Sequence, residues 1–467
     1  MPIILIIPVF FTIIAWWLRN PKLNNVMTIL HATIHIAMLP VLYLTSGFPW
    51  SVRYFTVDAL GLFFYLILSV LYLATAIYGV GFLTHPGRKH HTLTATGLMM
   101  FVFSMDGAFF ADNLGLLWVF IETTTLASAL LINYDQTRHS LEASWKYIFI
   151  CSIGIALAFV GILLLFVAMP SESSLTFSWL VDHASELSPF WLKISFVFLL
   201  IGFGTKLGLA PVHAWLPDAH SEAPAPVSAL LSGALLNTAL VPILRMMPIM
   251  QTAQLMPLAR NLLLLMGLLS VFIAAVFIVR IHNYKRILAY SSIENMGIVA
   301  IALGVGGIAL NAMFIHLLGH SFIKGAFFLI TGNVLRLYGT KDIREVKGLL
   351  QRDPRTGWLW LTAFLMLSAL PPSPLFFSEF QLALGMVGNG LVWQLALLLV
   401  LLTIVVFGMA KVSLRMTMGR DNTDARVSLP AYQWILPMLL LVAGIAILLM
   451  PSFMQNIIDQ AVILIGG

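Results

Sequence analysis

One apolar stretch of the sequence, from Ile201 to Ala234, concentrates ionisable side chains and helix-breaking residues. A charged side chain at the centre of a membrane helix costs roughly 2.5–3.5 kcal/mol on insertion scales, and such groups serve a function by default. Proline frees backbone groups, which are tolerated only where protein or a water-filled cavity satisfies them. A stretch that contains both buried ionisable groups and interrupted helix backbone is energetically costly, and this combination predicts an ion path. The stretch contains Pro211, Pro217, Pro224 and Pro226 together with Lys206, His213, Asp218, His220 and Glu222.

A carboxylate and a lysine in separate apolar segments form a candidate pair. Glu122 falls near the middle of LGLLWVFIETTTLASALLINY, where a carboxylate needs either a proton or a cationic partner. Lys206 is the natural partner, because burial and a nearby carboxylate act in opposite directions on the proton affinity of a lysine. Moving the two groups apart would change that affinity, as a pump requires. The alternatives are a static ion pair, or a protonated Glu122 bonded to Thr123–Thr125.

A second set of ionisable groups follows one helix face. His316, His320 and Lys324 recur at i, i+4 and i+8 in NAMFIHLLGHSFIKGAFF, so they line one face over about two turns. Histidine titrates near physiological pH, which suits a proton relay. A metal site would need carboxylates or further histidines in this segment, where none is evident, and plain packing is the remaining alternative.

Other ionisable residues of the apolar segments allow simpler interpretations. Glu294, in YSSIENMG, could join a relay or could cap and pack at the membrane face. His31 and His35 are also spaced i, i+4, but nothing else polar joins them in the sequence, which indicates satisfied histidines inside a helix bundle. Lys146 and Lys193 lie near segment ends, where a lysine can extend its ammonium group to water.

The elements that position these residues are membrane-spanning helices. The chain is 60% hydrophobic and only 9% charged, whereas soluble chains have about 25% charged residues. Its apolar runs have the length of membrane helices and lack the alternation of a membrane β-barrel. The single cysteine, Cys151, excludes a disulfide framework and cysteine-ligated clusters. No phosphate-binding loop or haem motif is present, so the energy for transport must come from an ion gradient or a partner protein.

We therefore expect an all-α polytopic membrane protein with about 14 transmembrane helices. With the N-terminus outside, the basic residues gather in the inside loops, so the net charge of +6 reflects the positive-inside rule and not nucleic-acid binding. Both termini then lie outside. The inside set is Arg19, Lys22, Arg88, Lys89, Arg138, Arg280, Lys285, Arg286, Arg336, Lys341, Arg344, Lys347, Arg352, Arg355, Lys411, Arg415, Arg420 and Arg426, and the outside set is Arg53, Arg245 and Arg260.

Two similar interruptions suggest an internal repeat. The first, Lys206–Pro211, lies as far into its block of spans as the second, LPPSPLFFSEF from Leu370 to Phe380, lies into the next block. Lys206 accompanies the first interruption and Glu379 the second. Paired interrupted helices in two halves are a sequence pointer to a transport site. The predicted parts are three N-terminal helices (1–91), two inverted five-helix repeats (92–248 and 257–418) and a C-terminal helix (431–467).

Three motifs resemble those of the antiporter-like subunits of respiratory complex I, membrane-bound hydrogenases and multisubunit Na⁺/H⁺ antiporters. They are KLGLAPVHAWLPDAHSEAPAPVSALLSG, KRILAYSSIENMG and HLLGHSFIKGAFFLITGNV. The resemblance covers nearly the whole chain and implies 14 helices, two inverted five-helix repeats and discontinuous helices 7 and 12. Within this superfamily, LSGALLNTALVPILRM, YSSIENMGI and LYGTKDIREVKGL are most similar to the F-type subunit of hydrogenase-4 and formate hydrogenlyase complexes.

The resemblance implies a proton relay from a carboxylate of the fifth helix, through a lysine of the seventh and a polar axis in the eleventh, to an exit residue in the twelfth. Quinone-reducing relatives usually place a lysine or histidine where this chain has Asn237, so that step needs water or another group such as Arg245. The implied relay is Glu122, Lys206, His316, His320, Lys324 and Glu379, with His213, Asp218, His220, Asn237, Arg245 and Glu294 as further candidates.

We expect a proton-translocating subunit of a complex I-like oxidoreductase of hydrogenase type, in the inner (cytoplasmic) membrane of a prokaryote. The resemblance implies no cofactor, metal or redox chemistry in this chain, and as partners other membrane subunits and a peripheral redox arm on the cytoplasmic side. Protons are the expected cargo and Na⁺ the alternative. The competing assignments are a Na⁺/H⁺ antiporter subunit without redox chemistry, an antiporter-like subunit of NADH:quinone oxidoreductase, and a membrane partner of an inorganic-carbon uptake complex.

Overall fold

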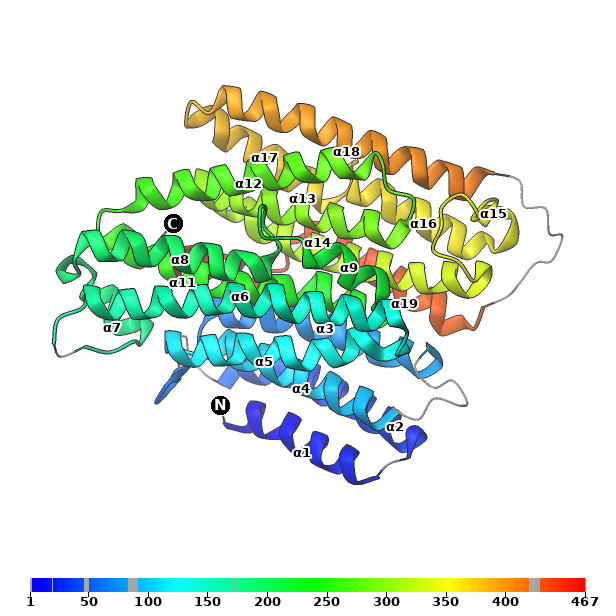
Figure 1. The fold of residues 1–467 in the computed structure, drawn as a ribbon, viewed down its shortest axis with the longest axis horizontal. Coiled ribbons are helices and arrows are strands. Elements are labelled where there is room, and N and C mark those ends of the chain that lie inside the picture. The colour runs from blue at the N-terminus through cyan, green and yellow to red at the C-terminus, as the bar shows by residue number, and fades with distance from the viewer. Residues whose placement is uncertain are drawn as a thin grey trace.

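The computed structural model describes residues 2–18, 20–45, 50–82, 91–171, 173–419 and 429–466. In these residues the chain forms a bundle of long helices that run side by side (Figure 1). Strands in the described part are confined to one hairpin, β1 (Trp50–Val52) with β2 (Phe55–Val57). Five basic residues of the predicted inside loops lie outside the described residues, namely Arg19, Arg88, Lys89, Arg420 and Arg426.

The helices follow one another with short connections. The first six are α1 (Pro2–Leu18), α2 (Pro21–Thr45), α3 (Ala59–Phe82), α4 (His91–Phe110), α5 (Leu114–Ile132) and α6 (Arg138–Ala168). The next five are α7 (Phe177–Asp182), α8 (Pro189–Leu207), α9 (Trp215–Glu222), α10 (Ala225–Leu230) and α11 (Leu236–Thr252). The last nine are α12 (Met256–Ile278), α13 (Tyr284–Val305), α14 (Ile308–Tyr338), α15 (Leu349–Arg352), α16 (Pro354–Leu367), α17 (Pro374–Gly388), α18 (Val392–Met418), α19 (Ala431–Ala446) and α20 (Ser452–Leu464).

Twelve helical segments of the described chain are long and apolar enough to cross a membrane. The all-α, polytopic fold is therefore confirmed. The count of fourteen stays a prediction, because α1 is shorter than the other candidates and the predicted twelfth span is divided between α16 and α17. Helix α14 lies at the centre, where it packs against α10, α13, α16, α17 and α19.

The first interruption separates α8 from α9. Gly208 adopts the left-handed conformation (φ 82°) that ends α8, which glycine does without a Cβ clash. The indole of Trp215 donates to the Thr205 carbonyl (2.7 Å), and the Ala210 N–H donates to Ser270 Oγ (2.9 Å). Side chains therefore satisfy the backbone groups that the broken helix frees.

The second interruption separates α16 from α17, as the proline cluster predicts. Ser373 Oγ donates to the Met366 carbonyl (2.7 Å) and accepts from the Leu375 N–H (3.2 Å). One serine side chain thus caps both sides of the gap. The inverted relation between the two halves stays a prediction.

The C-terminal segment differs from the single helix expected over 431–467. Helix α19 ends at Ala446, Met450 takes a left-handed conformation (φ 40°), and α20 begins after Pro451. Proline cannot donate a backbone hydrogen bond and restricts the residue before it, so the helix stops there. Helix α20 then packs against α3 and α14.

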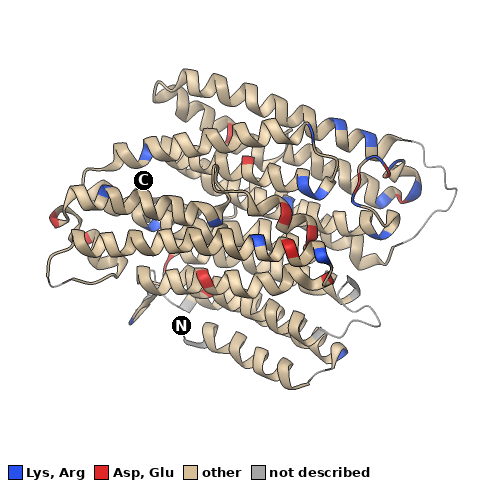
Figure 2. Cartoon of the chain, in the orientation of Figure 1, with Lys and Arg blue, Asp and Glu red and all other residues tan. Residues whose placement is uncertain are grey.

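Basic side chains gather at one end of the bundle, which we call the basic end (Figure 2). The opposite end holds the β-hairpin and α7, and both termini lie toward it (Figure 1). Among the basic residues predicted for the inside loops, those of the described part that lie in connections or in the first or last turns of helices include Lys22, Arg138, Arg280, Arg286, Lys341, Arg344, Lys347, Arg352 and Arg355.

Candidate functional site

Lys206 lies in the last turn of α8 and its side chain is completely buried. Its ammonium group donates to Thr125 Oγ1 of α5 (2.6 Å) and to the Tyr147 hydroxyl of α6 (2.8 Å). Two hydroxyl oxygens therefore replace the water that a lysine would otherwise bind.

Glu122 is half-buried and lies one turn before Thr125 on α5. Its carboxylate accepts from Thr125 Oγ1 (3.1 Å) and from Ser152 Oγ of α6 (3.0 Å). The structure thus joins Glu122 and Lys206 through the Thr125 hydroxyl, which accepts from the lysine and donates to the carboxylate. A hydroxyl group stands where the sequence suggested a direct ion pair.

His316, His320 and Lys324 of α14 are all buried, on the one helix face that their i, i+4, i+8 spacing predicts. Lys324 donates to Ser291 Oγ and to the Leu288 carbonyl (2.6 Å), both on α13. His316 contacts Asn295 Oδ1 of α13 (3.1 Å) and Ser378 Oγ of α17 (2.9 Å).

His320 lies between these two residues and is also completely buried. Neither of its ring nitrogens has a hydrogen-bond partner in the described part of the chain. A histidine with two uncommitted nitrogens can take a proton on one side and release it on the other.

Two carboxylates lie beside this line, and one of them, Glu294, is within electrostatic reach of Lys324. Glu294 is buried on α13, and its carboxylate accepts a long hydrogen bond from the side-chain amide of Asn295 (3.4 Å). Glu379 follows Ser378 on α17, is half-buried, and lies within electrostatic reach of Glu294. His316 therefore links α13 to the turn of α17 that bears Glu379.

Three candidates of α9 and its approach occupy different environments. His220 is completely buried, stacks on Phe328 (ring centroids 4.7 Å apart), and lies within electrostatic reach of Lys324. Asp218 instead forms ion pairs at the basic end, with Lys146 (3.4 Å) and with Arg286. His213 is half-exposed at the first interruption. Of the three, His220 is the one placed beside the relay.

Asn237 and Arg245 lie two turns apart on α11. Asn237 follows a π-helical turn, Leu231–Leu235, and its amide donates to the Gly233 carbonyl (2.9 Å) and to Ser321 Oγ (2.8 Å). Arg245 is committed elsewhere, in a buried ion pair with Asp58 (2.8 Å). The structure therefore does not bring Arg245 to the Asn237 step.

The sequence missed the uncharged partners that complete the site. Tyr147, Ser152, Asn295 and Ser378 contact the relay residues directly, yet single hydroxyl and amide groups occur throughout membrane helices and bonds between helices cannot be read from spacing. The i, i+4 spacing of Ser291 and Asn295 beside Glu294 was the available signal.

Two interrupted helices beside a buried line of ionisable groups define a membrane protein of the ion-translocating class. Residues 111–408 match the family described as NADH:quinone oxidoreductase/Mrp antiporter, transmembrane. The chain belongs to this family, as its motifs predicted.

The relatives span redox-linked and antiporter complexes. The chain is 39% identical over 340 residues (70% of this chain, 71% of the relative) to the hydrogenase-4 component F homolog of Methylacidiphilum infernorum. It is 32% identical over 374 residues (76% of this chain) to Na(+)/H(+) antiporter subunit A1 of Staphylococcus aureus strain JH9, of which it spans only 44%. The fold is shared with a chain of the membrane-bound sulfane sulfur reductase, an archaeal respiratory membrane complex (TM-score 0.91, 22% identity, coverage 99% and 97%).

Proposed function

We propose that this chain is the proton-translocating membrane subunit of a complex I-like oxidoreductase of the hydrogenase-4 type. The main observation behind this proposal is that the buried Lys206 ammonium is joined through Thr125 to the carboxylate of Glu122, which is half-buried in the isolated chain. The 39% identity to a hydrogenase-4 component F homolog favours the redox-linked branch of the family.

The mechanism is electrostatic. Glu122 is half-exposed, so a charge change in a neighbouring subunit reaches it with less screening than it would through water. The Thr125 hydroxyl is hydrogen-bonded to both groups, so a change in the charge of Glu122 alters the electric field at Lys206. The proton affinity of Lys206 changes with that field. Protons released at Lys206 enter the polar face of α14.

The later steps use the remaining buried groups. His320 and His316 pass the proton along α14, and Ser378 hands it to the turn of α17 that contains Glu379. The Asn237 amide cannot take up a proton, so Asn237 is not a proton carrier. Its hydrogen bond to Ser321 instead fixes the orientation of that hydroxyl on α14.

The proposal includes a placement in the membrane. The basic end faces the cytoplasm of a prokaryote and both termini face outward, because basic residues favour the cytoplasmic side. Other membrane subunits lie against the flanks, and the redox centres belong to partner subunits that form a peripheral arm at the basic end. The similarity of the fold to a chain of a respiratory membrane complex supports this assembly.

The test replaces Lys206 in the intact complex. Lys206→Met should lower proton translocation about 10²-fold, the usual contribution of a proton-transferring side chain, while the complex still assembles. Lys193→Met, on the exposed start of the same helix, is the matched control and should translocate normally. An assembled Lys206→Met complex that translocates protons at the wild-type rate would contradict the proposal.

A Na⁺/H⁺ antiporter subunit is the second candidate, favoured by the 32% identity to antiporter subunit A1. The hydroxyl oxygens of Thr125 and Ser152 around Glu122 are of the type that hard cations prefer. Sodium-dependent pH changes in vesicles that contain the purified complex, without any electron donor, would favour this candidate. Proton movement that needs electron transfer and ignores sodium would favour the first.

A further inference from the structure

A second buried ionisable cluster lies outside the relay, between α2, α3 and α4. His35 Nε2 lies 3.1 Å from both carboxylate oxygens of Asp106, a residue 71 positions further along the chain. On the other side of the ring, His35 Nδ1 lies 2.8 Å from Ser69 Oγ. Both ring nitrogens of His35 therefore have partners, as expected of a histidine inside a helix bundle. The partner Asp106 arrives from another helix, which no local spacing reveals.

The donors and acceptors of this cluster assign one proton to it. When Ser69 donates its single hydroxyl hydrogen to the Tyr65 carbonyl (2.7 Å), its oxygen accepts from His35 Nδ1–H. Nε2 then faces the Asp106 carboxylate. One proton lies between them in this arrangement, on the ring or on the carboxyl group, because otherwise two lone pairs would meet. In this arrangement the pair is electrically neutral.

His31 offers the next proton-binding position. It lies one turn before His35, with ring centroids 6.2 Å apart, and its Nδ1 contacts the Tyr72 hydroxyl (2.8 Å). Its Nε2 is buried and has no partner in the described chain. Helix α1 contributes the Phe11 ring and no ionisable side chain. The ionisable groups that face the cluster are thus His31, His35, Tyr65, Tyr72 and Asp106.

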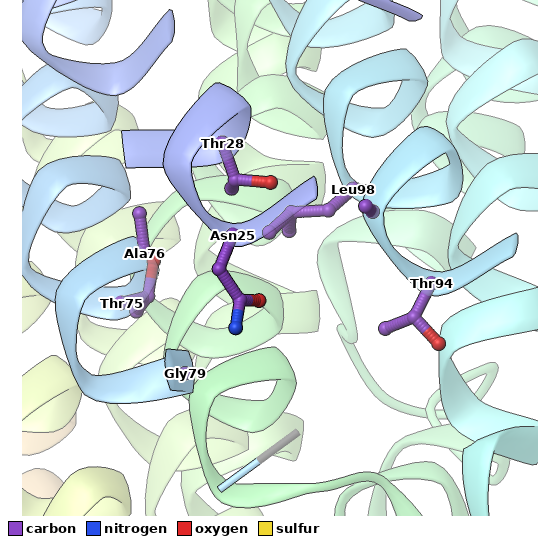
Figure 3. A pocket seen from close by; sticks show the side chains of 8 residues that line it. Asn25, Thr28, Thr75, Ala76, Gly79, Thr94 and Leu98 are labelled. Carbon is purple, nitrogen blue, oxygen red and sulfur yellow. The ribbon is translucent and has the colours of Figure 1, made fainter. Parts of the chain in front are cut away.

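A small cavity with a mixed polar and apolar lining lies between the same three helices (Figure 3). Its volume is about 20 Å³, which is room for one water molecule. Asn25, Thr28, Thr75 and Thr94 line it. Thr28 lies one turn before His31, and Thr75 lies one turn after Tyr72, so two lining residues are one helical turn from members of the cluster.

We propose that the His31–His35–Asp106 cluster is a second proton-binding site, filled by water through the cavity beside Thr28. The incoming proton binds His31 Nε2, and the neutral His35–Asp106 pair beside it tolerates the new charge.

This site is separate from the relay. Helix α3 stands between them: Leu71 packs against Gly233 and Gly325, and the Tyr78 hydroxyl donates to the Leu329 carbonyl (2.9 Å). Among the described residues, no hydrogen bond joins the cluster to the face of α14 that bears Lys324.

Hydrogen–deuterium exchange at the imidazole C2 position, followed by mass spectrometry of the intact complex, tests this site. The rate reports the access of each histidine to water, and its pH profile reports proton binding. His31 should exchange with a titration step. Asp106→Asn should shift that step, because His35 loses the carboxylate that shares its proton and the charge next to His31 changes. Thr28→Val should slow His31 exchange, because it removes the lining hydroxyl that lies one turn before His31.

Two controls keep the result interpretable. Ser104→Ala changes a buried hydroxyl of α4 that bonds only to its own helix, and it should leave the His31 profile unchanged. Lys206→Met should also leave it unchanged, so this site and the relay can fail independently. An unaltered His31 profile in Asp106→Asn, or unaltered exchange in Thr28→Val, overturns the proposal. If Asp106→Asn does not assemble, Thr28→Val still decides whether water reaches His31.

Discussion

Lys206 has two hydroxyl partners and no carboxylate in direct contact, and this choice shapes what the site can do. A lysine in contact with a carboxylate would be held in its charged form by a strong local pair. With Thr125 between them, Glu122 influences the ammonium group without fixing it. The proton on Lys206 therefore remains responsive to charges that arrive from outside the chain.

The bridging hydroxyl gives the first prediction at this scale. Thr125→Val keeps the shape of the side chain but leaves one proton of Lys206 without an acceptor, at a cost of about 1–3 kcal/mol. We expect proton translocation to fall about tenfold, since 1.4 kcal/mol corresponds to that factor. Proton pumping by the purified complex in vesicles provides the measurement.

Neighbouring substitutions separate this effect from general disturbance. Thr123→Val removes a hydroxyl that bonds to its own helix and should pump normally. Thr125→Ser retains the hydroxyl and should recover most of the activity. If Thr125→Val pumps as well as Thr123→Val, the hydroxyl does not connect Glu122 to Lys206.

At the scale of residues, the sequence singled out the ionisable groups that the structure buries and missed their hydrogen-bond partners. Lys206, His316 and Lys324 stand out because burying an ionisable group is costly, which makes each one informative on its own. Asp106 lies in an apolar helix in the same way, but its partner His35 becomes visible only once α2 and α4 are packed together.

At the scale of elements, the interruptions followed from proline and glycine, and the groups that stabilise them did not. Pro211 and the cluster near Pro372 mark where α8 and α16 must end. The donors that satisfy the freed groups, such as the Trp215 indole and Ser270, come from distant positions. Local sequence determines the break, and tertiary packing determines how the break is tolerated.

The contact between α12 and α13 gives a prediction about packing. A Cβ atom at Gly267 would lie 2.7 Å from the Gly297 carbonyl oxygen, so the two helices meet backbone to backbone. Gly267→Ala should destabilise the protein by about 1–3 kcal/mol through overpacking, measured as earlier thermal unfolding in detergent. Gly388→Ala is the control, since nothing lies within 4 Å of its added methyl group. Equal stability of the two variants would contradict this close packing.

At the scale of the whole molecule, we expect the separation of charge between the two ends to set the orientation in the membrane. The basic end and the end with the β-hairpin are distinct in Figure 2, as the loop composition predicted. The sequence could predict this pattern because topogenic charges are local to each loop. The lateral neighbours of the bundle could not be predicted, because they depend on surfaces assembled from several helices.

Labelling from the two sides of the membrane checks this orientation. A membrane-impermeant thiol reagent added to intact cells should modify Thr252→Cys and spare Glu345→Cys, because these exposed residues lie at opposite ends. Inside-out vesicles should reverse the pattern. The native Cys151 is completely buried and should not contribute. The opposite labelling pattern would contradict this orientation and would show that the basic end faces outward.

Cys151 has a further consequence. It is a free thiol on α6, one turn from Tyr147, within electrostatic reach of both Lys206 and Glu122. The stretching vibration of a buried S–H group absorbs in a quiet part of the infrared spectrum and shifts with the local field. The protein thus contains a native spectroscopic probe at the junction of the relay, which can report the movement of charge in real time without any label.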